Sequence, residues 1–318
     1  MRPRTKPKGL FRTLPVNTAY STASGVMLQG LAERVLNQRG LRSLEGKVQL
    51  IFTSPPFPLN TKKRYGNLNG AAYLEWLTGF GALFRDLLTD RGSIVIELGN
   101  SWEPGEPVMS TLGLKALLRF QEDNDLFLCQ EFICHNPARL PSPAQWVTIE
   151  RIRVKDSYTR LWWLSPTARP KASNKHVLKA YSPSMKQLLK TGTFNAGKRP
   201  SEHSISAKAF AKDHGGAIPP NVLAISNTGA VDEYQKYCRE HKIIFHPARM
   251  PSALPEFFIK FLTDKGDIVL DPFGGSNTTG AAAEGLGRRW IAIEPQTDYI
   301  KGSLGRFRNR KVRVGNIK

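Results

Sequence analysis

The chain has 318 residues, an ordinary apolar content of 40% and a formal charge of +20 at neutral pH. A charge this positive indicates a polyanionic partner, with nucleic acid before a membrane surface, because the sequence has no apolar span of about eighteen residues and no signal-peptide core. A soluble intracellular protein is therefore expected. Its three cysteines have no C-x-x-C spacing, which argues against a disulfide framework and a zinc knuckle.

Strands and helices are predicted to alternate through the first half of the chain. Residues 1–12 carry several basic side chains and no acid, so they form a tail that is either solvated or lies along phosphates. The apolar run at 48–52 ends at a double proline and predicts a buried strand, and the helical spacing at 73–88 predicts a core-facing helix. The other expected elements are helices at 28–36 and 108–120 and strands at 93–98, 126–134, 151–154 and 160–164. This alternation favours a parallel sheet that is covered on both faces.

A basic tract extends from residue 165 to residue 218. It holds ten lysine and arginine side chains against two acids, together with frequent glycine, serine and proline. A plain linker would be uncharged or balanced, so the tract predicts an inserted, loop-rich region that contacts DNA. Its three histidines have no metal-ligand spacing, and surface or hydrogen-bonded roles are expected for them.

The last section returns to regular elements. Residues 255–262 predict a helix that begins at a proline, and residues 267–270 and 290–293 predict two strands. Between these strands lies the sequence DPFGGSNTTG at 271–280, followed by an alanine-rich helix.

Residues 53–57, with the sequence TSPPF, follow the first buried strand and carry the first chemical signal. Pro55 and Pro56 have no N–H and push the preceding residues toward extended geometry, so the carbonyls of Ser54 and Pro55 lack local partners. These carbonyls and the Ser54 hydroxyl can accept hydrogen bonds from an amino group, and the Phe57 ring offers a face to a flat ring. The loop therefore suits the exocyclic amine of an extruded nucleobase, although a strand terminator is the simpler interpretation of these residues alone.

The second chemical signal is the order strand, glycine turn, helix, strand and acid at 267–294. Glycines allow close backbone approach to a nucleotide, and Glu294, nineteen residues after Gly275, is placed to accept from two ribose hydroxyls. The turn departs from G-x-G-x-x-G and has no Gly-Lys-Ser/Thr, which disfavours a P-loop phosphate site. It suits an adenosine without phosphate, such as S-adenosylmethionine; a tight turn followed by a surface glutamate is the alternative.

With both motifs in this order, the chain resembles amino-methylating DNA methyltransferases of the β arrangement, specifically the N4-cytosine type of restriction-modification systems. TSPPF is similar to the catalytic motif of that family and DPFGGSNTT to its cofactor loop, and ELGNSW and HPARMP are similar to further blocks. The resemblance covers nearly the whole chain and implies an α/β, Rossmann-like fold with a mostly parallel sheet and circularly permuted motif order. The implied parts are a catalytic half at 1–164, a target-recognition region at 165–235 and a cofactor-binding half at 236–318.

The resemblance also implies a role for each motif residue in transferring a methyl group from S-adenosylmethionine to the N4 amine of a flipped cytosine in double-stranded DNA. The implied catalytic residues are Ser54, Pro55, Pro56 and Phe57. The implied cofactor-binding residues, with no metal, are Thr53, Asp271, Phe273, Gly275, Ser276, Asn277, Thr278 and Glu294. The basic residues predicted to bind DNA are Lys62, Arg64, Lys171, Lys175 and Arg199. Two departures, Leu31 and Asn100, stand where family members often carry aspartate, and they put a supporting contact in doubt.

Alternatives stay open at this point. In an N6-adenine methyltransferase the motif usually begins with Asp or Asn, so Ser54 favours cytosine without deciding the base. A non-catalytic DNA-binding protein with this fold and an RNA substrate are further alternatives, whereas cytosine carbon-5 methylation is disfavoured because the chain has no Pro-Cys thiolate. The resemblance further implies functional pairing with a restriction endonuclease, without a stable complex, and a cytoplasmic, nucleoid-associated location.

Overall fold

The computed structural model describes residues 15, 17–57, 68, 70–192, 197–198, 200–202, 204–205, 212–226 and 232–317. The chain divides into two units, named here unit 1 (Met1–Ala172 and Asn221–Lys318) and unit 2 (Ser173–Pro220). The predicted tail at 1–12 and the predicted DNA contacts Lys62, Arg64 and Arg199 lie outside the described residues. No helix in the described ranges is long and apolar enough to cross a membrane.

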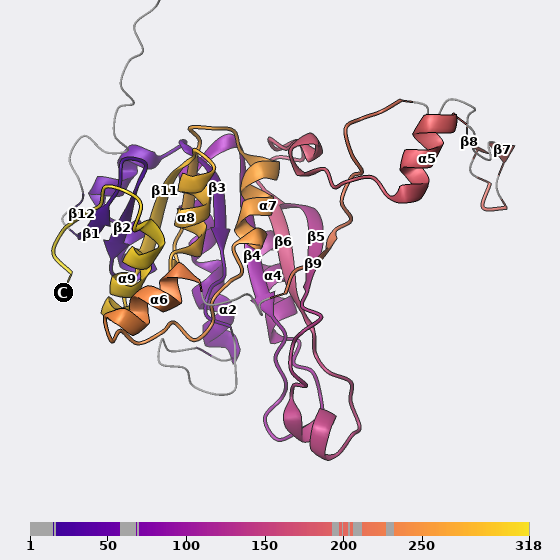
Figure 1. Cartoon of the computed structure of the whole chain (residues 1–318). Helices are drawn as coiled ribbons and strands as arrows, with labels where there is room; N and C mark the ends of the chain where they lie inside the picture. Colours follow the sequence, from indigo (N-terminus) through magenta and orange to yellow (C-terminus); the bar gives the residue numbers. More distant parts are fainter. Residues whose placement is uncertain are drawn as a thin grey trace, which may run out of the picture. The chain divides into compact units, whose positions relative to one another are not determined.

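A ten-stranded sheet runs through the described part of unit 1 in the order β12-β1-β2-β11-β10-β3-β4-β6-β5-β9 (Figure 1). The five strands from β2 to β4 in this order are parallel. Strand β6 is antiparallel to β4 and β5, β1 is antiparallel to β2 and β12, and β9 pairs with β5 in parallel. The strands are β1 (Thr18–Ser21), β2 (Gly25–Gln29), β3 (Val48–Thr53), β4 (Leu88–Gly99), β5 (Phe127–His135), β6 (Tyr158–Ser165), β9 (Val222–Ala224), β10 (Ile268–Asp271), β11 (Arg289–Glu294) and β12 (Arg313–Val314).

The central strands are mostly apolar, which is typical of a parallel sheet with both faces covered. Every residue of β3 and of β10 is buried. The helices that pack on one face are α1 (Ala32–Leu36), α2 (Gly70–Thr78), α3 (Phe80–Leu87) and α4 (Leu112–Glu122). Those on the other face are α7 (Ala253–Leu262), α8 (Thr278–Gly285) and α9 (Thr297–Ser303), with α6 (Glu233–Glu240) packed on α9. The predicted α/β fold with a mostly parallel sheet is confirmed.

The structure corrects several predicted elements. The predicted helix at 73–88 is two helices, since Gly79, a poor helix former, separates α2 from α3. The segment 151–154, predicted as a strand, is exposed and unpaired in a connection between β5 and β6. The predicted helix at 28–36 begins only at Ala32, because Leu28 is paired in β2. Strands β1, β9 and β12 escaped prediction because runs of four, three and two residues carry little periodicity.

Unit 2 lies within the predicted target-recognition region at 165–235 and is shorter at both ends. Its helix α5 (Pro183–Thr191) begins with the Ser182 side chain capping the first turn. The Tyr181 hydroxyl accepts a hydrogen bond from the His214 N–H over 2.9 Å, which connects the two ends of the unit. The other described elements of unit 2 are the strands β7 (Gly197–Lys198) and β8 (Ser204–Ile205) and a 3₁₀ turn at Asn174–Val177.

Candidate active site

The two chemical motifs meet at one edge of the sheet. TSPPF follows β3 and DPFGGSNTT follows β10, and because these strands are parallel neighbours their carboxyl ends lie side by side. The Thr53 hydroxyl donates to Asp271 Oδ1 over 2.9 Å. Both side chains are buried, so this hydrogen bond fixes the position of one loop relative to the other.

A cavity of about 890 Å³ opens between these loops. The predicted catalytic residues that line it are Ser54, Pro55, Pro56 and Phe57. The predicted cofactor-binding residues that line it are Asp271, Phe273, Gly275, Ser276, Thr278 and Glu294. The volume lies toward the upper end of the range for small-molecule and cofactor sites.

The glycine turn orients a carboxylate at the cavity wall. Gly275 has a φ of 50°, and a Cβ at this position would lie 2.9 Å from His246 Nε2, so the turn needs glycine for both conformation and space. The Gly275 N–H donates to Glu294 Oε2 over 2.9 Å, and the Gln296 N–H donates to Oε1 over 2.8 Å. Burial raises the pKa of Glu294 to about 7, and these backbone hydrogen bonds partly offset that rise.

Asp271 anchors the cofactor loop from within. Its Oδ2 accepts from the Thr279 hydroxyl over 2.7 Å, and its Oδ1 accepts from the Phe273 N–H over 3.1 Å as well as from Thr53. Burial raises the pKa of Asp271 to about 6, against the effect of these three hydrogen bonds. Thr53, predicted to contact the cofactor, is not among the described residues that line the cavity, and its contribution is the hydrogen bond to Asp271.

Asn277, which was also predicted to contact the cofactor, is not among the described residues that line the cavity. Its side-chain oxygen accepts from the Gly280 N–H over 3.1 Å at the start of α8, and its amide donates to the Tyr20 hydroxyl over 2.9 Å. The side chain is fully buried behind the loop and acts as a helix cap. The cofactor loop is also held by Arg306, which donates to the Ser276 carbonyl over 2.7 Å and to the Ser276 hydroxyl over 3.1 Å.

Glu97 is a site residue that the sequence predictions missed. It lies on β4, next to β3, and lines the cavity. The Thr159 hydroxyl donates to Glu97 Oε1 over 2.8 Å, and the Ser54 hydroxyl also hydrogen-bonds this carboxylate. Burial raises the pKa of Glu97, while these two hydrogen bonds and the charge of Arg139 lower it. The signal in the sequence is a lone carboxylate within the apolar run at 93–98.

Aromatic rings form part of the cavity wall. The Phe57 ring lies against Gly99, where a Cβ would approach the ring to 2.5 Å, so glycine makes room for it. The Phe273 ring centroid lies 5.4 Å from that of Trp76 and 5.3 Å from that of Phe80. These rings are held by packing and offer apolar faces to flat ligands.

His246, within HPARMP, is a second residue whose place in the site no single motif revealed. It lines the cavity, and its ring lies edge-on to Tyr299 with centroids 4.5 Å apart. Burial lowers the pKa of His246 to about 4, so the imidazole is neutral at neutral pH. A neutral ring beside the glycine turn adds no positive charge to this wall.

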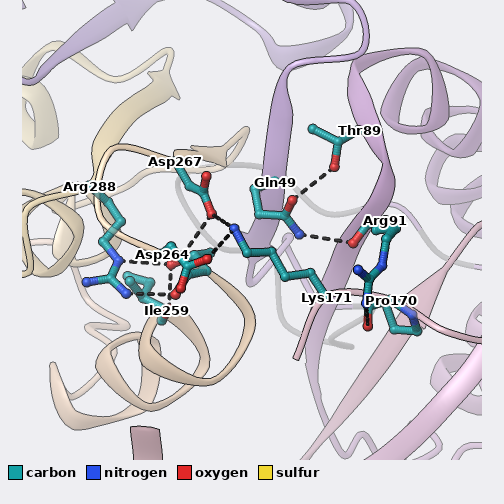
Figure 2. Close-up of polar contacts among 10 residues, drawn as sticks. Gln49, Thr89, Arg91, Pro170, Lys171, Ile259, Asp264, Asp267 and Arg288 are labelled. Atoms are coloured by element: carbon teal, nitrogen blue, oxygen red, sulfur yellow. Dashed lines mark hydrogen bonds and ion pairs between the residues drawn. The ribbon is translucent and has the colours of Figure 1, made fainter. Parts of the chain in front are cut away.

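The predicted DNA-binding lysines have different surroundings. Lys171, in unit 1, pairs with Asp264 and Asp267, in each case over 2.7 Å (Figure 2). Partial burial lowers the pKa of Lys171, but the hydrogen bonds and charges of the two aspartates raise it overall. Lys171 therefore binds the segment before β10 and is not a free charge for phosphate. Lys175, in unit 2, is exposed.

The two departures from the family pattern also have defined positions. Asn100 donates from its side-chain amide to Asp156 Oδ1 over 2.9 Å, and Asp156 is buried. An asparagine at this position thus satisfies a buried carboxylate that an aspartate would repel. Leu31 lines the cavity with an exposed side chain.

Comparison with known proteins gives consistent matches over this region. A family model described as DNA methylase, N6_N4_Mtase, matches residues 48–304. The type II methyltransferase M.PvuII of Proteus hauseri is 40% identical over 296 residues, which cover 92% of this chain and 87% of that protein. The DNA adenine methyltransferase YhdJ of Escherichia coli (strain K12) is 45% identical over 77 residues, which cover 24% of this chain and 23% of that protein.

Solved structures show the same likeness. The structure of PvuII DNA methyltransferase (cytosine-N4-specific) matches with a TM-score of 0.73 at 36% identity and covers 92% of this chain and 89% of that chain. The M1.HpyAVI–SAM complex matches with a TM-score of 0.50 at 22% identity and covers 89% of this chain and 98% of that chain. At 22% identity, the likeness to the M1.HpyAVI–SAM complex shows a shared fold and nothing more.

Proposed function

Because the chain belongs to the DNA methylase family, we propose that it transfers a methyl group from S-adenosylmethionine to the exocyclic N4 amine of cytosine in duplex DNA. The observation that carries this proposal is the hydrogen bond of Ser54 to the partly buried Glu97, in a cavity that also contains the glycine turn after β10. The choice of cytosine is supported by a cytosine-N4-specific relative that matches 92% of the chain.

The wall formed by β10 and β11 fits S-adenosylmethionine. Gly275 allows close backbone approach, and the Glu294 carboxylate, oriented by two backbone N–H groups, can accept from two ribose hydroxyls. Phe273 offers an apolar face, and the neutral His246 adds no positive charge against a sulfonium. When bound, the cofactor supplies an electrophilic methyl group.

Ser54 and the proline loop can hold the amine for attack. The Ser54 hydroxyl donates a hydrogen bond to the Glu97 carboxylate, so its oxygen can still accept a hydrogen bond from one N4–H of the cytosine. A loop carbonyl can accept a hydrogen bond from the other N4–H. These hydrogen bonds direct the nitrogen lone pair away from the cytosine ring and toward the methyl group. The amine loses one proton as the nitrogen–carbon bond forms, and the Glu97 carboxylate, with its raised pKa, can take that proton through Ser54.

The target cytosine must leave the duplex to reach this loop, because its amine is otherwise inside the base stack. Phe57, on the cavity wall, is the residue that would stack on the extruded ring. Lys175 and its basic neighbours in unit 2 supply phosphate contacts in this proposal. Functional pairing with a restriction endonuclease, without a stable complex, and a cytoplasmic, nucleoid-associated location are part of the same proposal.

The test uses purified protein, S-adenosylmethionine with a deuterated methyl group, and long mixed-sequence duplex DNA made by amplification, which carries no modified bases. Digestion to nucleosides and mass spectrometry identify the product, and sequencing maps the modified position. Deuterated N4-methylcytosine supports the proposal. Deuterated N6-methyladenine would support methyl transfer to an exocyclic amine but would overturn the choice of cytosine as the target base. Absence of any labelled nucleoside favours a DNA-binding protein without turnover or an RNA substrate. Ser54→Ala, prepared in parallel, controls for a contaminating activity.

A further inference from the structure

Residues 136–157 form an arm, named here the β5–β6 arm, that projects from the sheet between these two strands (Figure 1). The Asn136 N–H donates to the Ser157 carbonyl over 2.8 Å at its base. Nearer the tip, the Ile152 N–H donates to the Trp146 carbonyl over 2.9 Å. Because backbone hydrogen bonds hold both ends of the arm, its side chains are presented in a defined arrangement.

Four apolar side chains of the β5–β6 arm face solvent. The exposed fraction is 80% for Leu140, 68% for Ile149, 48% for Ile152 and 88% for Val154. Single exposed apolar residues are ordinary, but a group of them on one projecting segment marks an interaction surface.

The charges of the β5–β6 arm indicate the partner. Its basic side chains are Arg139, Arg151, Arg153 and Lys155. Its two acids both have hydrogen-bond donors. Glu150 accepts from Gln145 over 2.7 Å, and the buried Asp156 accepts from Asn100. Apolar side chains set among cations fit DNA, where phosphates flank a stack of apolar base faces, better than they fit an apolar protein surface.

The base of the arm belongs to the wall of the active-site cavity, since Asn136, Arg139 and Ser157 line it, next to Tyr158 at the start of β6. A duplex that delivers a base to Ser54 must therefore pass beside the arm. Extrusion of a base breaks its stacking and leaves a gap in the duplex, and an apolar side chain in that gap offsets part of the cost.

We propose that the β5–β6 arm inserts Leu140 or Val154, its two most exposed apolar side chains, into the duplex beside the target nucleotide and fills the space that the extruded base vacates. The basic side chains of the arm contact the flanking phosphates. This inference rests on the proposed function, because it requires a base that leaves the duplex.

Two double variants test the inference. Leu140→Ala/Val154→Ala shortens the two arm side chains, and Leu118→Ala/Val314→Ala makes the same changes on α4 and β12, at side chains that are 47% and 60% exposed. All of these side chains are exposed, so both proteins are expected to keep the wild-type Tm. The substrates are two duplex oligonucleotides that carry the mapped site, with the target cytosine opposite either guanine or an abasic nucleotide.

The arm variant is expected to lose on the order of tenfold or more in kcat/KM on the paired duplex. On the abasic duplex the loss is expected to stay below about twofold, because no base pair has to open. The control variant is expected to match the wild type on both substrates. A wild-type rate of the arm variant on the paired duplex, or an equal loss on both duplexes, would overturn the proposal.

Failure of the proposed function would give a different result, namely no methylated base from the wild type on any duplex. Fluorescence anisotropy then tests the arm without turnover, with a duplex in which an abasic nucleotide replaces one base and so leaves the gap that the arm would fill, and with the same duplex without that replacement. Weaker binding of the abasic duplex by the arm variant than by the control variant supports the insertion. Equal affinities of the two variants overturn it.

Discussion

The Thr53 hydroxyl donates to Asp271 Oδ1 over 2.9 Å and joins the end of β3 to the end of β10. The catalytic loop and the cofactor loop therefore share one buried anchor. Asp271 is held from its own side by Thr279 and by the Phe273 N–H, and Thr53 links it to the catalytic loop.

Thr53→Val keeps the shape of the side chain and removes this donor. We expect the free energy of unfolding to fall by about 1–3 kcal/mol, because a buried carboxylate loses a hydrogen bond, and the affinity for S-adenosylmethionine to fall with it. Thr78→Val is the matched control, since among the described residues the Thr78 hydroxyl is buried without a partner. Urea unfolding and calorimetry measure both effects. Equal stabilities of the two variants would contradict the role of the anchor.

Ser54→Ala and Glu97→Gln are expected to lower kcat by about 100-fold or more while the Kd for S-adenosylmethionine changes little, because neither side chain belongs to the cofactor wall. Phe57→Ala is expected to act in the same direction through loss of base stacking. Because burial raises the pKa of Glu97, the acid limb of the pH–rate profile is expected above the ordinary pKa of a glutamate and is expected to vanish in Glu97→Gln. A wild-type kcat for Ser54→Ala would remove the amine-orienting role.

Glu294 predicts a pH dependence of cofactor binding. Its pKa is about 7, so the carboxyl is protonated below this pH and ionised above it. The ionised form accepts more strongly from ribose hydroxyls, and the affinity for S-adenosylmethionine is therefore expected to rise with pH through about 7. Glu294→Gln should abolish this dependence and, above that pH, weaken binding by about 1.5–3 kcal/mol. Calorimetry across the pH range measures both; a pH-independent wild-type affinity would disprove the assignment.

The same shift makes a separate prediction for stability. Because the pKa of Glu294 is raised in the folded state, its contribution to stability is fully present below the ordinary pKa of a glutamate and is lost as the pH rises to about 7. The stability of the wild type relative to Glu294→Gln is therefore expected to decrease over this window. Asp271, with a pKa of about 6, titrates in both proteins, and its charge adds to the rise in the pKa of Glu294. Urea unfolding at several pH values gives the difference, and a flat difference would contradict the raised pKa.

Arg306 predicts an indirect effect on the cofactor loop. It donates to the Ser276 carbonyl and hydroxyl, and it pairs with Asp232 over 3.4 Å. We expect Arg306→Met to lower the free energy of unfolding by about 1–3 kcal/mol, since the Ser276 carbonyl and hydroxyl lose the hydrogen bonds of a mostly buried guanidinium, and to weaken cofactor binding. Arg308→Met, at an exposed pair with Glu240, is the control and is expected to change both by little. If Arg306→Met kept the wild-type cofactor affinity, Arg306 would have no positioning role.

Local sequence was sufficient for the parts of the site that follow one strand. Ser54 and Gly275 could be found because a double proline and a glycine turn impose their backbone geometry within a few residues. Glu97 could not be assigned in this way, because its contact with Ser54 depends on which strand lies next to β3. His246 reaches the glycine turn from a distant part of the chain, so no spacing indicates it. Asn277 belongs to the matching motif, yet its side chain caps a helix, which only the coordinates reveal.

A count of basic residues along the sequence does not show which of them are available to bind DNA phosphates. Two lysines of the basic tract can be compared to test this point. Lys171 and Lys175 were predicted to bind DNA for the same reason, but Lys171 is paired with Asp264 and Asp267 whereas Lys175 is exposed in unit 2.

Lys171→Ala is therefore expected to lower the free energy of unfolding by about 1 kcal/mol and to leave DNA affinity nearly unchanged. Lys175→Glu is expected to weaken DNA binding and to reduce the slope of log affinity against log salt by about 1, with no change in Tm. Urea unfolding and anisotropy titrations at several salt concentrations separate the two effects. An unchanged salt slope for Lys175→Glu would move the phosphate contacts to other residues, and a reduced slope for Lys171→Ala would mean that its ion pairs open when DNA binds.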